Sequence, residues 1–213
     1  MLAGKVAVIT GANGGLGRFV TKAFLDAGAT VTGVSRSIQD SDFPQPGFSA
    51  LAVELNSGDA AGHIVAAVIA RHPRLDILVH LMGGFAGGQS VPETSDETLD
   101  RMLDINFRSA FWMTRAALAV MGDGGRILAI GSRAAIEPPA GVSAYSASKA
   151  ALIALILTIA QENKPRGVTA NVILPTTLNP QISASVASLA VWLASDGASQ
   201  VSGAAIPVYG AEL

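Results

Sequence analysis

Short, continuously apolar runs rich in β-branched residues alternate with longer helical patterns along the whole chain. The runs that we expect to form strands are Val6–Thr10, Thr30–Ser35, Ser49–Glu54, Ile77–Leu81, Gly125–Ser132, Thr169–Leu174 and Ala204–Val208. The helical patterns are Gly15–Ala27, Asp59–Arg71, Asp96–Val120, Ser143–Asn163 and Ser183–Ala194. A strand without a polar face must be buried on both sides, as in a parallel sheet covered by helices. The alternation therefore predicts an α/β fold with a doubly wound parallel sheet, in a single domain over residues 1–213.

Composition and charge exclude several classes of protein. Of the 213 residues, 50% are hydrophobic and only 14% are charged, whereas disordered chains have low hydrophobicity and high net charge. The formal net charge of −2 supplies no basic field for nucleic acid or for an anionic membrane surface. The chain has no cysteine, and His63, His72 and His80 lack the spacing of metal ligands. We therefore expect neither disulfides nor a metal site.

Signals for membrane insertion or export are not apparent in the sequence pattern. The longest apolar runs, such as Ala150–Leu157, are far shorter than the ~20 residues of a transmembrane span. Residues 1–10 lack the charged start, the long apolar stretch and the cleavage site of a signal peptide. We therefore expect a cytoplasmic protein.

A glycine-rich turn follows the first expected strand and precedes the first expected helix. It reads Thr10-Gly11-Ala12-Asn13-Gly14-Gly15-Leu16-Gly17. In this position, glycine allows a tight turn and lets the backbone approach a pyrophosphate, whose charge then lies at the helix N-terminus. The turn predicts a Rossmann fold with a dinucleotide-binding loop, whose members are Gly11, Asn13, Gly14, Gly15, Leu16 and Gly17. The alternative is a turn that is glycine-rich for steric reasons alone.

Further motifs follow this loop in a fixed order. The glycine spacing is TGxxxGxG, Asn106 lies in a helical pattern, Ser132 follows the fifth strand, and Tyr145 and Lys149 form a YxxxK motif. With these motifs, nearly the whole chain resembles the short-chain dehydrogenase/reductase family. One turn departs from the family pattern: residues 80–83 read His-Leu-Met-Gly instead of Asn-Asn-Ala-Gly, and only the glycine is retained.

The side chains of this motif set are suited to acid–base chemistry. Tyr145 and Lys149 share one helix face, with Cβ atoms about 5–6 Å apart, and an ammonium beside a phenol favours the phenolate. Tyr145 would exchange a proton with the substrate oxygen, to which Ser132 would hydrogen-bond. The resemblance implies that Lys149 also binds the nicotinamide ribose and that Asn106 holds a water between Lys149 and solvent. Each residue alone has an ordinary structural explanation, but their joint occurrence favours catalysis.

The end of the second strand indicates which cofactor binds. Enzymes that bind NAD usually place an acid here for the ribose 2′-hydroxyl, whereas a nearby arginine accommodates the 2′-phosphate of NADP. The chain has Ser35 and Arg36 at this point and no acid. We therefore expect NADP(H) to be favoured over NAD(H); the alternative is an ordinary exposed loop arginine. The resemblance also places Glu54 and Leu55 beside the adenine, and Met82 and Gly83 beside the rest of the cofactor.

The segment after the sixth strand is short for this family. The resemblance places Pro175, Thr177 and Leu178 beside the cofactor, but the usual substrate-covering lobe, near residues 178–185, is very short or missing. Two explanations remain open, namely a substrate site that has no lid and a sequence from which a segment has been omitted.

The resemblance implies an NAD(P)-dependent oxidoreductase that interconverts a carbonyl and a secondary alcohol of a small molecule by hydride transfer. Residues 83–88 and 174–179 are similar to dihydropteridine reductases, a branch of the same family, so reduction of a quinonoid pterin is an alternative. An alternative of another class is an NADP(H)-binding redox sensor or scaffold with little turnover.

The helical patterns at 98–121 and 145–163 are apolar on more than one face. A helix that packs on one side of a sheet needs only one apolar stripe, so a second apolar face indicates burial against another molecule. We expect a homodimer or homotetramer formed through these helices.

Overall fold

The computed structural model describes residues 1–210 and contains a seven-stranded, fully parallel sheet in the order β3-β2-β1-β4-β5-β6-β7. The strands are β1 (Val6–Thr10), β2 (Thr30–Ser35), β3 (Phe48–Ala52), β4 (Ile77–His80), β5 (Arg126–Ile130), β6 (Thr169–Pro175) and β7 (Ala205–Val208). The strand order reverses between β1 and β4, which is where a doubly wound sheet opens a crevice at the carboxyl ends of its strands. The predicted doubly wound parallel sheet is confirmed.

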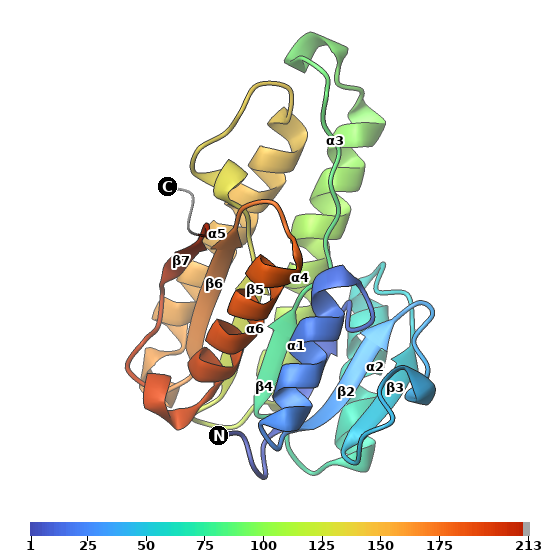
Figure 1. The fold of residues 1–213 in the computed structure, drawn as a ribbon, viewed down its shortest axis with the longest axis vertical. Helices are drawn as coiled ribbons and strands as arrows, with labels where there is room; N and C mark the ends of the chain where they lie inside the picture. The colour runs from blue at the N-terminus through green and yellow to red at the C-terminus, as the bar shows by residue number, and fades with distance from the viewer. Residues whose placement is uncertain (211–213) are drawn as a thin grey trace.

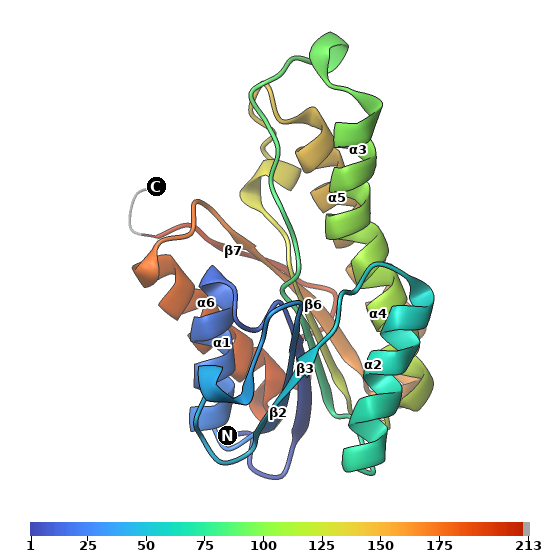
Figure 2. The same cartoon turned by 90° about the vertical axis from the view of Figure 1, so that its right-hand side faces the viewer.

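Helices cover both faces of the sheet (Figures 1 and 2). The helices are α1 (Gly15–Asp26), α2 (Gly58–Arg71), α3 (Asp96–Leu103), α4 (Ser109–Val120), α5 (Ser143–Glu162) and α6 (Pro180–Ala194). Short 3₁₀ turns occur at Asp40–Asp42, Val91–Glu93, Arg133–Ala135, Lys164–Arg166 and Asp196–Ala198. In Figure 2, α1 and α6 lie together on one side of the sheet, and α2, α4 and α5 lie on the other.

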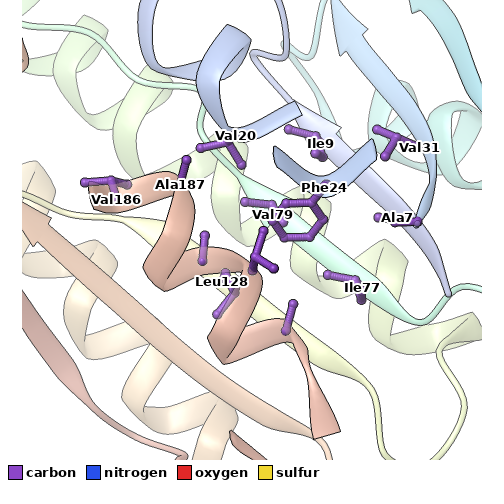
Figure 3. Packing of buried hydrophobic residues seen from close by; sticks show 14 of the residues in the cluster. Ala7, Ile9, Val20, Phe24, Val31, Ile77, Val79, Leu128, Val186 and Ala187 are labelled. Atoms are coloured by element: carbon purple, nitrogen blue, oxygen red, sulfur yellow. The ribbon is translucent and has the colours of Figure 1, made fainter. Parts of the chain in front are cut away.

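Strands β1 to β6 contribute residues to two separate hydrophobic cores. Ala7 and Ile9 of β1 face the core beneath α1 and α6, whereas Val6 and Val8 face the core beneath α2, α4 and α5. Figure 3 shows the first core, in which Phe24 of α1 lies fully buried among strand residues. Burial of one such side chain contributes about 1.5–3 kcal/mol. Two-sided burial explains why the strands are apolar without alternation.

Several predicted boundaries differ from those of the structure. The third strand runs over Phe48–Ala52 rather than Ser49–Glu54, and the fifth ends at Ile130, so that Ser132 lies beyond it. The sixth helix begins at Pro180 rather than at Ser183. The side-chain oxygen of Asn179 accepts a hydrogen bond from the Ile182 amide at 2.8 Å, and proline suits the first helical position because it has no amide to satisfy.

The segment expected as one helix over Asp96–Val120 is interrupted. Residues 104–108 form a π-helical turn between α3 and α4, although the three parts run on as a long column in Figure 2. The Ser109 amide donates to the Asp104 carbonyl, five residues back, as in a π-helix. Such turns occur often at functional sites, and this one carries Asn106.

The helix α5 is long and apolar enough to cross a membrane if only length and composition are considered. Half of its apolar window is buried within the fold, and Leu152, Ile156 and Ile159 belong to the second core. We therefore interpret α5 as a core helix of the α/β domain.

The chain passes directly from β6 to α6. Residues 176–179 alone connect Pro175 to Pro180, and residues 180–185, where a reduced lobe was expected, form the start of α6. The structure therefore has no separate substrate-covering element between this strand and this helix.

Candidate active site

A cleft of about 1300 Å³ lies along the carboxyl edge of the sheet. Most of the residues singled out in the sequence line it, from every strand between β3 and β6 in the sheet order. They are Gly11, Asn13, Gly14, Gly15, Leu16, Gly17, Ser35, Arg36, Glu54, Leu55, Met82, Gly83, Ser132, Tyr145, Lys149, Pro175 and Leu178. Segments far apart in the sequence meet there because parallel strands end at the same edge.

Two of the predicted residues do not line the cleft. Thr177 is exposed, and Thr176 lines the cleft in its place. Asn106 is fully buried behind the cleft wall. The lining also includes Phe85, from the segment 83–88, and Trp112, which belongs to no sequence motif. Trp112 lies on α4, which packs against α2. Its position at the cleft therefore follows from the packing of these two helices and not from a local sequence pattern.

The glycine loop allows a close approach of backbone to backbone. Gly11 has a φ of +69°, which glycine adopts readily, and its amide donates to the Val34 carbonyl at 2.7 Å. A Cβ on Gly17 would overlap the Gly11 carbonyl oxygen, so α1 could not pack this tightly on the loop with any other residue. The first turn of α1 has no acidic side chain and Gly14 provides no side-chain cap. The exposed amide dipoles therefore fit an anionic pyrophosphate.

An arginine lies at the other end of the cleft. The Arg36 side chain is 80% exposed, and its Nη1 lies 4.0 Å from Oε1 of Glu54. Leu55 is buried next to Glu54 and lines the same cleft. This end offers an apolar wall beside an exposed cation, which suits an adenosine that carries a phosphate.

Lys149 is held in a buried position at the start of α5. It is 5% exposed, and its Nζ donates a hydrogen bond to the Ile130 carbonyl at 2.8 Å. Burial lowers the pKa of Lys149 to about 8, because removal from water disfavours the ammonium. The group therefore changes charge close to neutral pH.

Ser132 directly follows β5 at the cleft wall. Its Oγ accepts a hydrogen bond from the Ala134 amide at 3.2 Å. This bond orients the side chain and leaves the hydroxyl hydrogen free to donate. A substrate oxygen placed between Ser132 and Tyr145 could accept that hydrogen.

Asn106 positions the turn that follows β4. Its Oδ1 accepts from the Gly84 amide, and its Nδ2 donates to the Gly84 carbonyl, each at 3.0 Å, and to Ser148 Oγ at 3.1 Å. Both amide hydrogens are thus used within the protein, so the side chain supports the cleft wall rather than donating to a water. A Cβ on Gly83 would lie 2.9 Å from Asn106 Oδ1 and 3.1 Å from Lys149 Nζ. The retained glycine is what lets these groups approach each other.

The residue that replaces the family's first asparagine is a buried histidine. His80 Nδ1 lies 3.1 Å from Thr10 Oγ1, and Nε2 lies 3.2 Å from Ser109 Oγ. Burial, together with the nearby charge of Lys149, lowers the pKa of His80 to about 3. His80 is therefore neutral at any pH at which the protein would work.

The substrate side of the cleft is open and partly aromatic. The Phe85 ring is 67% exposed and meets the Tyr145 ring edge to face, with centroids 5.0 Å apart. Leu178, in the short connection before α6, is also exposed. Within residues 1–210 no group of three or more His, Cys, Asp or Glu side chains lies in position to hold a metal ion.

Comparison with known proteins shows sequence similarity along most of the chain. Residues 5–189 match the family model described as short chain dehydrogenase. The human protein named dehydrogenase/reductase SDR family member 4 is 32% identical over 185 residues, covering 82% of this chain and 66% of the human protein. The match therefore spans slightly less than two thirds of that relative's length.

Two further comparisons extend over almost the full chain. The cyclic-di-GMP-binding biofilm dispersal mediator protein of Escherichia coli K12 is 31% identical over 234 residues, covering 98% of this chain and 97% of that protein. That alignment is longer than this chain of 213 residues, so the relative has internal residues without a counterpart here. A crystal structure of a blue fluorescent protein from a metagenomic library, in complex with NADPH, matches with a TM-score of 0.87 and 28% identity, covering 98% of each chain. This chain therefore belongs to the short-chain dehydrogenase/reductase family.

Proposed function

We propose that the protein is an NADP(H)-preferring oxidoreductase that interconverts a carbonyl and a secondary alcohol. The single observation that carries this proposal is one continuous cleft lined by the glycine loop, Ser132, Tyr145 and Lys149. When bound, NADP(H) supplies or accepts the hydride. A protein that only bound the nucleotide would need the loop but not the acid, so the residues favour turnover over a redox sensor or scaffold.

In the direction of reduction, the chain's own residues handle the proton. The Ser132 hydroxyl donates to the carbonyl oxygen and orients it, since its Oγ is already fixed by the Ala134 amide. Tyr145 gives its phenolic proton to the same oxygen as the alcohol forms. The phenolate that remains is stabilised by the Lys149 ammonium, which the Ile130 carbonyl holds in place.

The cofactor preference rests on the charge at the end of β2. Arg36 is the cation that the cleft presents beside Ser35, where an acid would favour NAD. Its exposed guanidinium can leave Glu54 and bind a phosphate through two hydrogen bonds. The related NADPH complex is consistent with this preference.

The open side of the cleft favours a substrate with a flat conjugated system. The exposed Phe85 ring lies beside Tyr145 and offers an aromatic face to a ligand. Quinones and aromatic ketones have this shape, and so does a quinonoid pterin. Pterin reduction is therefore the second candidate function, favoured by this one contact.

We also propose a homo-oligomer formed through α4 and α5. Phe111 and Val120 of α4 are exposed apolar side chains on the outer face, and Ile153 and Leu155 of α5 are only half-buried. A second copy that covers these helices would remove this apolar surface from water.

Replacement of Tyr145 by phenylalanine removes the proton donor and retains the ring. We expect kcat for reduction to fall by about 10²–10⁴-fold, the usual contribution of a general acid, with NADPH affinity nearly unchanged. The measurements are NADPH oxidation with ketones, aromatic quinones and a quinonoid pterin, and the Kd from NADPH fluorescence. Tyr209→Phe, the same change at the chain's other tyrosine, is the control and should retain activity.

Retained activity in Tyr145→Phe would exclude Tyr145 as the acid. Firm NADPH binding by the wild type without any turnover would favour the sensor.

The titration of Lys149 predicts a pH dependence for reduction. Since its pKa in the free protein is about 8, kcat/KM should decline as the pH rises above about 8, where the ammonium that stabilises the phenolate is lost. In Lys149→Arg the cation persists, so the decline should move to higher pH. An identical profile for both proteins would show that another group controls this limb.

Arg36→Ala tests the cofactor preference. Loss of a charge-assisted phosphate contact costs about 1.5–3 kcal/mol, so the Kd for NADPH should rise about 10- to 150-fold while that for NADH changes little. Arg71→Ala, at the end of α2 and outside the cleft lining, is the matched control. The preference is wrong if the wild type binds NADH as tightly as NADPH.

Light scattering coupled to size exclusion tests the oligomer. The wild type should elute at a multiple of 21.6 kDa, and Phe111→Glu should shift the mass toward the monomer by placing a charge in the interface. Phe19→Glu makes the same change on α1, on the opposite side of the sheet, and should leave the mass unchanged. A monomeric wild type would contradict the proposal.

A further inference from the structure

We propose that His80 is a positioning residue that ties the turn after β4 to the π-helical turn at 104–108, and so sets both beside Lys149. It lies at the end of β4, is 1% exposed, and does not line the cleft. Its two ring nitrogens reach Thr10 on one side and Ser109 on the other. The proposal rests on the proposed function, because positioning matters only if the cleft performs a reaction.

The direction of the hydrogen bond to Thr10 follows from counting donors. Thr10 Oγ1 accepts from the Leu81 amide at 3.2 Å and from the Met82 amide at 3.3 Å. Both lone pairs of the hydroxyl are then in use, so its hydrogen must be donated to His80 Nδ1. Nδ1 is therefore the acceptor, which fixes the orientation of Thr10 toward the Met82–Gly83 side of the cleft.

The second ring nitrogen acts as the donor. In a neutral imidazole with Nδ1 as acceptor, the hydrogen resides on Nε2, which donates to Ser109 Oγ at 3.2 Å. The Ser109 hydroxyl in turn donates to the Ile105 carbonyl at 2.8 Å. The hydrogen bonds thus run in one direction, from Thr10 through His80 and Ser109 to Ile105.

The far end of this series lies in the π-helical turn itself. Ile105 and Ser109 flank Asn106, whose side chain holds both backbone groups of Gly84. The near end lies where Gly11 and Met82 approach each other, since a Cβ on Gly11 would be 3.2 Å from the Met82 amide nitrogen. His80 therefore joins two walls of the cleft that are separated in sequence. A protonated ring would break the series, because Nδ1 could no longer accept.

Two substitutions separate the two ends of the series. Asparagine places its amide oxygen near the position of Nδ1, so His80→Asn keeps an acceptor for Thr10 and loses the donor to Ser109. Glutamine places its amide nitrogen near the position of Nε2, so His80→Gln keeps the donor to Ser109 and loses the acceptor for Thr10. Ser109→Ala removes the contact to Ser109 from the other side, together with the hydrogen bond from Ser109 to the Ile105 carbonyl. Thr10→Val removes the contact to Thr10, together with the acceptor of the Leu81 and Met82 amides.

The expected results differ between the two variants. In His80→Asn the π-helical turn should loosen: amide hydrogen exchange of residues 105–109 should be about tenfold faster, and kcat about tenfold lower, with the Kd for NADPH within about threefold of wild type. In His80→Gln the Kd for NADPH should rise about fivefold or more, with exchange at 105–109 unchanged. Ser109→Ala should give at least the first result, and the two changes together should be less than additive, because both remove the hydrogen bond between residue 80 and Ser109.

Equal changes of Kd, kcat and exchange in the two variants, or none in either, would overturn the proposal and leave His80 a packing residue. If His80→Asn fails to fold, Ser109→Ala replaces it. If His80→Gln fails to fold, Thr10→Val replaces it, with a larger expected rise in the Kd for NADPH because the Leu81 and Met82 amides also lose their acceptor. Exchange and NADPH affinity need no substrate, so they test His80 even if no carbonyl compound is reduced. Conversely, the wild type can be active and Tyr145→Phe can lose activity as expected while the two His80 variants behave alike. That result would refute only the role of His80 and leave the proposed function intact.

Discussion

Burial of both faces of the parallel sheet is the constraint on which the rest of the structure depends. Alternate residues of β1 enter opposite cores, Ala7 and Ile9 on one side and Val6 and Val8 on the other. Such strands leave little room for exposed polar side chains along their length. The polar residues that could bind a ligand or transfer a proton therefore lie after the strands rather than within them. Because all strands are parallel, these residues gather at one edge. The cleft is the result of this gathering rather than of a separate element.

At that edge, function depends on how closely backbone segments can approach. Gly17 lets α1 pack on the Gly11 carbonyl, and Gly83 leaves space for Asn106 and Lys149. The same proximity removes Lys149 from water, which is costly for an ammonium and lowers its pKa toward neutrality. The Ile130 carbonyl offsets part of that cost. The glycine and the buried lysine therefore depend on each other, because a larger residue at position 83 would lie too close to the Lys149 side chain.

Much of the fold and of the site could be predicted from the sequence because the signals were local. The apolar runs predicted the strands. The glycine loop and the YxxxK motif of Tyr145 and Lys149 are each contained in a short, continuous stretch of sequence. The start of α6 was also readable, since Asn179 followed by Pro180 is a typical cap and first helical residue. Its predicted start at Ser183 missed that signal.

Features that arise from tertiary contacts could not be predicted. The helical pattern over 96–120 is unbroken in sequence, and the π-helical turn is visible only with its partners at Gly84 and His80 in place. A lone histidine in a sequence resembles any surface histidine, and its two partners are distant in the chain. The choice between Thr176 and Thr177 depends on how β6 ends, which no local pattern reveals.

The direct passage from β6 to α6 has a consequence for how the protein exchanges its ligands. With only residues 176–179 between these elements, this connection supplies no hinged segment that would have to open before a ligand leaves or enters. Recognition then depends on the residues that already line the cleft, such as the exposed Phe85. Under the proposed function, a bulky substrate would present its carbonyl to Tyr145 while most of its bulk stays in solvent. A connection without a lid makes the cleft easier for a ligand to reach, but it does not supply the exclusion of water that a closing lid provides.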